Sequence, residues 1–91
     1  MAGIRKELEL DDNIQGMSWK EEVIVDEEVY EKYDYYLSYD YIDALRNVGY
    51  ECSLYDKETE ELVVSDYDLC VDGAVDRAEN KVWELLEKEN K

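Results

Sequence analysis

The chain has 91 residues, of which 26 are Asp or Glu, 10 are Lys or Arg and none is His, so the formal net charge is −16. This length fits one domain spanning residues 1–91, and a charge of this sign excludes direct binding to DNA, RNA or anionic membranes. The hydrophobic fraction of 45% is ordinary for a folded protein, so the composition does not indicate disorder.

The N-terminal third gives one clear signal and one conflict. The first dozen residues predict a short strand with the apolar members Ile4, Leu8 and Leu10. Within residues 19–30 the signals disagree. Ser18 and Glu21 fit a helix capping box, whereas the β-branched run 23–25 favours a strand. The sequence leaves this choice between helix and strand open.

Two helices are predicted in the middle of the chain. Residues 27–37 have helical spacing, with Val29, Tyr30, Tyr33 and Leu37 on one side. Residues 38–48 predict a second helix that Ser38 caps and Gly49 ends. Its apolar stripe consists of Tyr41, Ile42, Leu45 and Val48.

A hairpin is predicted next. Residues 50–55 alternate between apolar and polar side chains, and residues 62–64 form the returning strand. The connection 56–60 is a tight turn without the usual glycine. Glu60 stands at its left-handed position, so slight strain is expected there.

The C-terminal segment predicts a helix over residues 74–87, with Asp72 as its cap. The expected fold class is therefore α+β: a β-hairpin, with room for a third antiparallel strand, packed against two or three helices with a long C-terminal helix. The predicted core contains Leu54, Val63, Val75, Val82 and Leu86.

Residue patterns for catalysis and metal binding are missing from the sequence. Without His there is no Ser–His or Cys–His pair, so no enzyme activity is expected. Cys52 and Cys70 are too far apart for a CxxC motif, and both are expected to be buried, reduced and inert. A calcium loop starting at Asp66 would need Glu at its twelfth position, where Arg77 stands. No cofactor and no metal site is predicted.

The distinctive feature is an acidic segment rich in tyrosine. Residues 21–68 hold sixteen acids and three bases, and the chain has nine Tyr but no Phe. Tyrosine suits half-exposed binding surfaces, and acids three or four residues apart on a helix would lie about 5–6 Å apart. The candidate partner-binding residues are Glu27, Glu28, Glu31, Tyr33, Asp34, Tyr36, Asp40, Glu58, Glu60 and Glu61.

This profile resembles small acidic phage-encoded inhibitors of bacterial defence, which include anti-CRISPR proteins and DNA mimics that block restriction. The resemblance rests on the acids of residues 21–43, the hairpin acids and the flanking tyrosines. It implies a DNA mimic whose carboxylates occupy the basic nucleic-acid-binding groove of a CRISPR effector or restriction enzyme. It also implies a cytoplasmic location, in the bacterial host cell if a phage encodes the protein.

Two alternatives remain open at this stage. The first is an immunity protein or antitoxin that blocks the cationic cleft of a nuclease toxin. The second is a non-catalytic acidic accessory subunit whose charge serves solubility. The inhibitor and immunity-protein hypotheses both require a protein partner with basic surface, and none of the three hypotheses involves a membrane.

Overall fold

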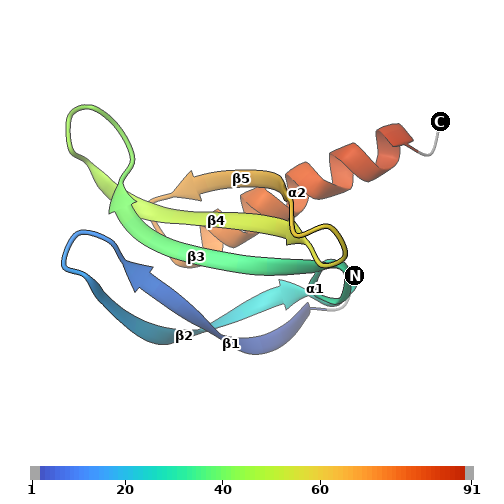
Figure 1. Ribbon diagram of the computed structural model, residues 1–91, viewed down its shortest axis with the longest axis horizontal. Coiled ribbons are helices and arrows are strands. Elements are labelled where there is room, and N and C mark those ends of the chain that lie inside the picture. Colours follow the sequence, from blue (N-terminus) through green and yellow to red (C-terminus); the bar gives the residue numbers. More distant parts are fainter. Residues whose placement is uncertain (1–2, 90–91) are drawn as a thin grey trace.

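The computed structural model describes residues 3–89, which form a five-stranded sheet and two helices (Figure 1). The elements in chain order are β1 (Gly3–Asp12), β2 (Met17–Asp26), α1 (Glu27–Lys32), β3 (Tyr33–Tyr41), β4 (Val48–Asp56), β5 (Leu62–Asp68) and α2 (Val71–Glu89). The described part of the chain measures 42 × 28 × 24 Å, with the C-terminal end of α2 at one end of the long axis and the β1–β2 and β3–β4 loops at the other (Figure 1).

The sheet has the strand order β2-β1-β3-β4-β5 and is mostly antiparallel. β1 and β3 pair in parallel over a short stretch, from Leu10 opposite Leu37 to Asp12 opposite Tyr39. Helix α2 packs against β5 and β4 and also contacts the far edge strand β2. The sheet therefore curls around α2 and leaves its other face open (Figure 1).

The core lies between α2 and the concave face of the sheet. Strands and helices both supply fully buried apolar side chains, and five of these are Leu10, Leu37, Leu54, Val75 and Val82. Strand alternation places Leu37, Cys52 and Leu54 on this face, since Leu37 pairs with Cys52 across β3 and β4 and Leu54 lies two residues after Cys52. The predicted core residues Leu54, Val75 and Val82 are confirmed, and Val63 and Leu86 pack against them half-buried.

The coarse α+β prediction is confirmed, as are the first strand, the hairpin and the C-terminal helix. Glu60 has a φ of 61°, so the turn between β4 and β5 does contain a non-glycine residue in the left-handed region. Helix α2 begins at Val71, and the carbonyl of Cys70 accepts the first hydrogen bond from Ala74 N–H. Asp72 therefore lies inside the first turn, where its charge complements the helix dipole, and it does not cap the helix.

The predicted helix over residues 38–48 is wrong. Residues 38–41 complete β3, and Val48 and Gly49 begin β4, which pairs with it in antiparallel register. Tyr41, Ile42 and Val48 are aromatic or β-branched, and residues of these types favour strands although their spacing here is helical. Gly49 does not end a helix but lies in β4, where the chain passes close to Asp68. A Cβ atom at this position would lie 2.9 Å from the carbonyl oxygen of Asp68.

The helix predicted over residues 27–37 is confirmed only to Lys32. Asp26 caps it by accepting hydrogen bonds from Glu28 N–H and Val29 N–H. From residue 33 onward the chain pairs with β4, and the ladder of backbone hydrogen bonds outweighs the helical pattern. The open choice for residues 19–30 resolves as strand to Asp26 and helix from Glu27, so the capping-box signal was misleading.

Candidate partner-binding surface

The open face of the sheet, on the side away from α2, is the candidate site. In β3 the side chains of Asp34, Tyr36, Ser38 and Asp40 alternate with the core-facing ones. The paired strands add acids and rings to this face. Hereafter the acidic sheet face means Asp11, Asp34, Tyr36, Asp40, Glu51, Tyr55 and Tyr67.

This face has no positive charge along β3, β4 and β5. β3, β4 and β5 together contain six Asp or Glu and no Lys or Arg. Neighbouring strands lie about 4.8 Å apart and residues rise about 3.3 Å along a strand, so Asp34 and Asp40 stand about 20 Å apart on one strand. Asp11 and Glu51 flank the buried Ser38 on either side, about 10 Å from each other.

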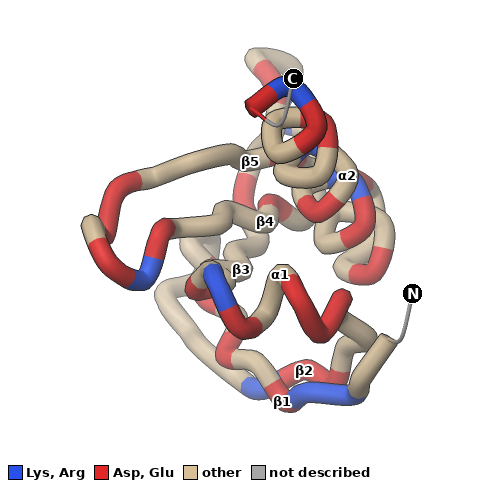
Figure 2. The backbone as a smooth tube through the Cα atoms, turned by 90° about the vertical axis from the view of Figure 1, so that its right-hand side faces the viewer, with Lys and Arg blue, Asp and Glu red and all other residues tan. Residues whose placement is uncertain are grey.

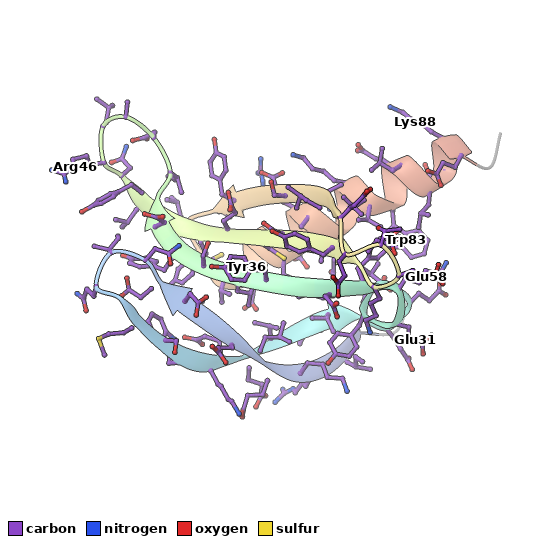
Figure 3. The ribbon with its side chains drawn as sticks, viewed as in Figure 1. Glu31, Tyr36, Arg46, Glu58, Trp83 and Lys88 are labelled. Carbon is purple, nitrogen blue, oxygen red and sulfur yellow. The ribbon has the colours of Figure 1, made fainter. Side chains whose placement is uncertain are left out.

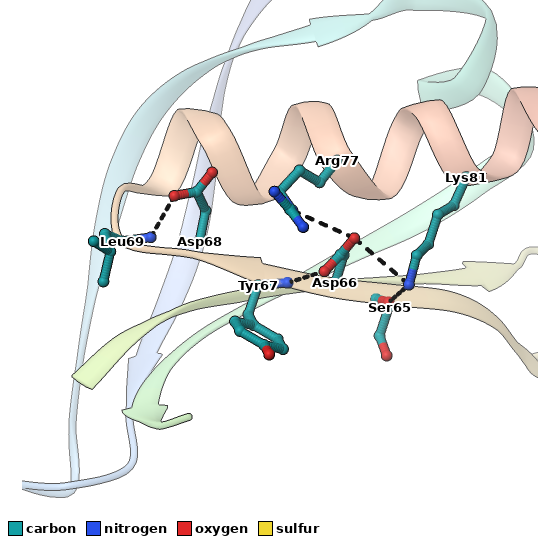
Figure 4. A network of polar contacts seen from close by, with 7 residues as sticks. All are labelled: Ser65, Asp66, Tyr67, Asp68, Leu69, Arg77 and Lys81. Carbon is teal, nitrogen blue, oxygen red and sulfur yellow. Dashed lines mark hydrogen bonds and ion pairs between the residues drawn. The ribbon is translucent and has the colours of Figure 1, made fainter. Parts of the chain in front are cut away.

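On the opposite face of the same strands, one acid is neutralised by the helix. Asp66 of β5 forms ion pairs with Arg77 and Lys81 of α2, both at 3.5 Å (Figure 4). Burial alone would raise the pKa of Asp66, but the hydrogen bond from Tyr67 N–H and these two charges outweigh it and lower that pKa. The bases of α2 are thus used on the helix side. On the open face, Arg5 and Lys20 of β1 and β2 pair with Glu22 and Glu7, whereas no acid of the acidic sheet face forms an ion pair within residues 3–89.

The tyrosine rings on the acidic sheet face are partly exposed, and hydrogen bonds hold the hydroxyl of one of them, Tyr36. Tyr36 is 38% exposed and lies over the middle of the sheet (Figure 3). Burial and a hydrogen bond to Asp11 raise its pKa, while a bond to Asn13 works in the opposite direction. None of the nine tyrosines is fully buried, which confirms the expectation of half-exposed rings.

An open groove of about 400 Å³ lies at one end of the acidic sheet face. Asp34, Tyr36, Tyr55 and Glu60 line it, and Tyr35 adds to its wall. Asp34 and Tyr55 are directly opposite each other across β3 and β4, and a β-bulge between Leu54 and Tyr55 shifts the register beside them. Bulges of this kind commonly change the direction of a side chain near a site.

The ten candidate residues fall into three places. Asp34, Tyr36, Asp40 and Glu60 lie on the acidic sheet face or at its groove. Five exposed acids gather instead at the end of the molecule formed by α1 and the β4–β5 turn, seen end-on in Figure 2 and marked by Glu31 and Glu58 in Figure 3. These end acids are Glu27, Glu28, Glu31, Glu58 and Glu61.

Tyr33 lies apart from both groups. Its side chain is half-buried beside Trp83 and Leu86 of α2, and burial raises its pKa. Sequence reasoning missed Asp11, Glu51, Tyr55 and Tyr67, which complete the acidic sheet face. Strand alternation in residues 33–41 and 50–55 could have grouped most of them, had residues 33–41 been assigned to a strand.

The buried polar groups form a structural network. Glu79 of α2 accepts hydrogen bonds from Tyr35 O–H at 2.5 Å and from Asp26 N–H at 2.8 Å, and Trp83 donates to Asp26 at 3.3 Å. Burial raises the pKa of the nearby Cys52 thiol to about 12, so this cysteine is inert as predicted. Cys70 is exposed, which corrects the expectation that both thiols are buried.

Residues 3–89 contain no group of three or more metal-ligating side chains placed to hold an ion. Neither helix among them is long and apolar enough to cross a membrane. Comparison with protein-family models, with curated proteins and with solved structures gives no match for this chain.

Proposed function

We propose that the protein is a non-catalytic inhibitor that binds the basic nucleic-acid-binding groove of a bacterial defence effector, either a CRISPR effector or a restriction enzyme. Its acidic sheet face takes the place of the phosphates, and bound inhibitor excludes the nucleic acid. The observation that carries this proposal is the open face of β3, β4 and β5, which presents carboxylates and tyrosine rings together and no Lys or Arg.

Charge and rings play different parts in this proposal. Uncompensated carboxylates such as Asp34, Asp40 and Glu51 speed the encounter with a basic groove, and that effect weakens as salt screens it. The rings of Tyr36, Tyr55 and Tyr67 supply the desolvated contact area that slows dissociation. Association should therefore be sensitive to ionic strength, while the complex persists at salt concentrations that release polyelectrolytes from nucleic acid.

The end acids are a second negative surface, and the test must separate the two. One variant reverses three charges on the sheet face: Asp34→Lys, Asp40→Lys and Glu51→Lys. The matched control reverses three end acids: Glu31→Lys, Glu58→Lys and Glu61→Lys. Both change the net charge equally. Glu27 and Glu28 are left intact, because they stabilise the first turn of α1.

Binding is measured by interferometry to a panel of purified CRISPR effectors and restriction enzymes, with and without competing duplex DNA. The parent should bind at least one of them and should be displaced by DNA. The sheet-face variant should lose about 2–5 kcal/mol of binding free energy, and the control should lose much less. Equal losses would point to bulk charge. If the parent binds none of the panel, or binds without DNA competition, the proposal fails.

A further inference from the structure

The groove at the end of the acidic sheet face has a chemistry of its own. We propose that it binds the guanidinium group of an arginine side chain, presented by the protein partner. This deepens the proposed function and rests on it for the identity of the partner, since arginine is the residue that lines phosphate-binding grooves most effectively. The assignment depends on the charge, the rings and the rigidity of the groove.

Two carboxylates, those of Asp34 and Glu60, supply the charge of the groove. No Lys or Arg lines it, and neither carboxylate forms an ion pair with any residue of the part that the structure describes. Lys57 belongs to the same turn as Glu60, yet its ammonium lies over the ring of Tyr30, 5.4 Å from the centroid. The groove therefore keeps an uncompensated negative charge that a cation from outside can neutralise.

Two phenol rings, from Tyr36 and Tyr55, add flat apolar surface beside those carboxylates. A guanidinium is planar and weakly hydrated, so it stacks on aromatic faces while its N–H groups bind carboxylate oxygens in pairs. A lysine ammonium is compact and strongly hydrated, and it gains less from such surface. Carboxylates and rings in one groove thus favour arginine over lysine.

The groove is also held in shape before any ligand binds. Glu60 N–H donates to the Asp56 carbonyl at 2.8 Å, and Asp56 N–H donates to the Glu61 carbonyl at 3.0 Å. The Asp56 carboxylate accepts from Glu58 N–H at 2.7 Å. These bonds fix the turn that carries Glu60 at its positive φ, and a ligand entering the groove loses little of its affinity to ordering the turn.

The test is a titration of the ¹⁵N-labelled full chain with N-acetyl-arginine amide, and separately with N-acetyl-lysine amide, at low ionic strength. Arginine amide should shift the backbone amide signals of residues 34–36, 55 and 60. Its apparent Kd should be lower than that of lysine amide by about 2- to 5-fold, the ratio that corresponds to an exposed cation–π contact of about 0.5–1 kcal/mol. Equal affinities for the two amides would overturn the proposal.

Two variants and one control locate the effect. Glu60→Gln and Tyr55→Leu should each weaken arginine binding at least about twofold, because each removes one groove contact. Glu84→Gln changes the net charge as much as Glu60→Gln, but it lies exposed on α2 outside the groove, so it should leave the shifts unchanged. The same spectra report whether each variant is folded. If Glu84→Gln weakens binding as much as Glu60→Gln, the effect is bulk attraction and the groove is not a site.

The two proposals can fail separately. Selective arginine binding without binding to any defence effector supports the groove and refutes the proposed function. Effector binding by the parent, with no selective arginine shifts, supports the function and refutes the groove.

Discussion

Glu79 on α2 accepts a 2.5 Å hydrogen bond from the hydroxyl of Tyr35 on β3, 44 residues away in the chain. The same carboxylate accepts from Asp26 N–H at the junction of β2 and α1. One buried side chain thus joins the long helix, the central strand and the start of the short helix. It therefore links α2 to the sheet on the face opposite the acidic sheet face.

Tyr35→Phe keeps the ring and removes the donor. We expect the free energy of unfolding to fall by about 1–3 kcal/mol, because a buried carboxylate loses a hydrogen bond. Urea unfolding at pH 7 measures this change. Tyr67→Phe is the control, since Tyr67 is 49% exposed and its change should stay within about 0.5 kcal/mol. Equal effects of the two variants would contradict a structural role for the Tyr35–Glu79 bond.

Glu79→Gln should flatten the pH dependence of stability. Burial raises the pKa of Glu79 above its ordinary value of 4.5, although the hydrogen bonds from Tyr35 and Asp26 oppose this shift. A raised folded-state pKa means that the group's contribution to stability is present below the unfolded pKa and is lost as the pH rises through the folded pKa. The parent should therefore lose stability relative to Glu79→Gln as the pH rises above 4.5.

Urea unfolding at several pH values across this range checks the difference. Glu84→Gln serves as the charge-matched control, because Glu84 is exposed on α2. The free energy of unfolding is plotted against pH for the parent, Glu79→Gln and the control. If all three plots run parallel, the titration of Glu79 does not contribute to the pH dependence of stability.

Glu60→Gly should stabilise the protein and impair the groove. A non-glycine residue at φ 61° carries backbone strain, and glycine removes it at some cost in unfolded-state entropy. A net gain of about 0.5–1 kcal/mol is expected in the free energy of unfolding. The selective shifts with arginine amide should weaken in the same variant. A variant that is less stable than the parent would show that Glu60 itself stabilises the turn.

Gly49→Ala and Gly73→Ala should behave differently. A Cβ atom at Gly49 would meet the backbone oxygen of Asp68 at 2.9 Å, and paired strands cannot easily separate, so a cost of about 1–3 kcal/mol is expected. A Cβ atom at Gly73 would meet only the Asp68 side chain, which can move. The helix propensity of alanine, about 1 kcal/mol better than that of glycine, then offsets much of the cost. Thermal unfolding should rank the Gly49 variant clearly lower.

The two thiols should react at very different rates. Cys70 is exposed, whereas Cys52 is fully buried with a pKa raised to about 12. Ellman's reagent at pH 8 should therefore modify one thiol per native chain within minutes and the second only after denaturation. Cys70→Ser should abolish the fast reaction. Two fast thiols in the native protein would mean that β4 opens readily in solution.

The sequence by itself determined the elements that depend on local patterns. The 3.6-residue periodicity predicts the C-terminal helix, and alternation followed by a turn predicts the hairpin of β4 and β5. The position of Glu60 in that turn predicts its left-handed backbone conformation. It also determined the surplus of acids and the half-exposed tyrosines, because composition is independent of fold.

Only the tertiary structure decided which surface those acids form. Residues 33–41 satisfy the helical and the strand pattern alike, and the choice went to the strand because β4 and β1 both pair with it through backbone hydrogen bonds. Its parallel pairing with β1 joins residues 27 positions apart, as Leu10 and Leu37 show, and no local pattern encodes such a contact. Because residues 33–41 form a strand, successive side chains point to opposite faces of the sheet. Leu37 therefore lies in the core, and Asp34, Tyr36 and Asp40 lie on the open face.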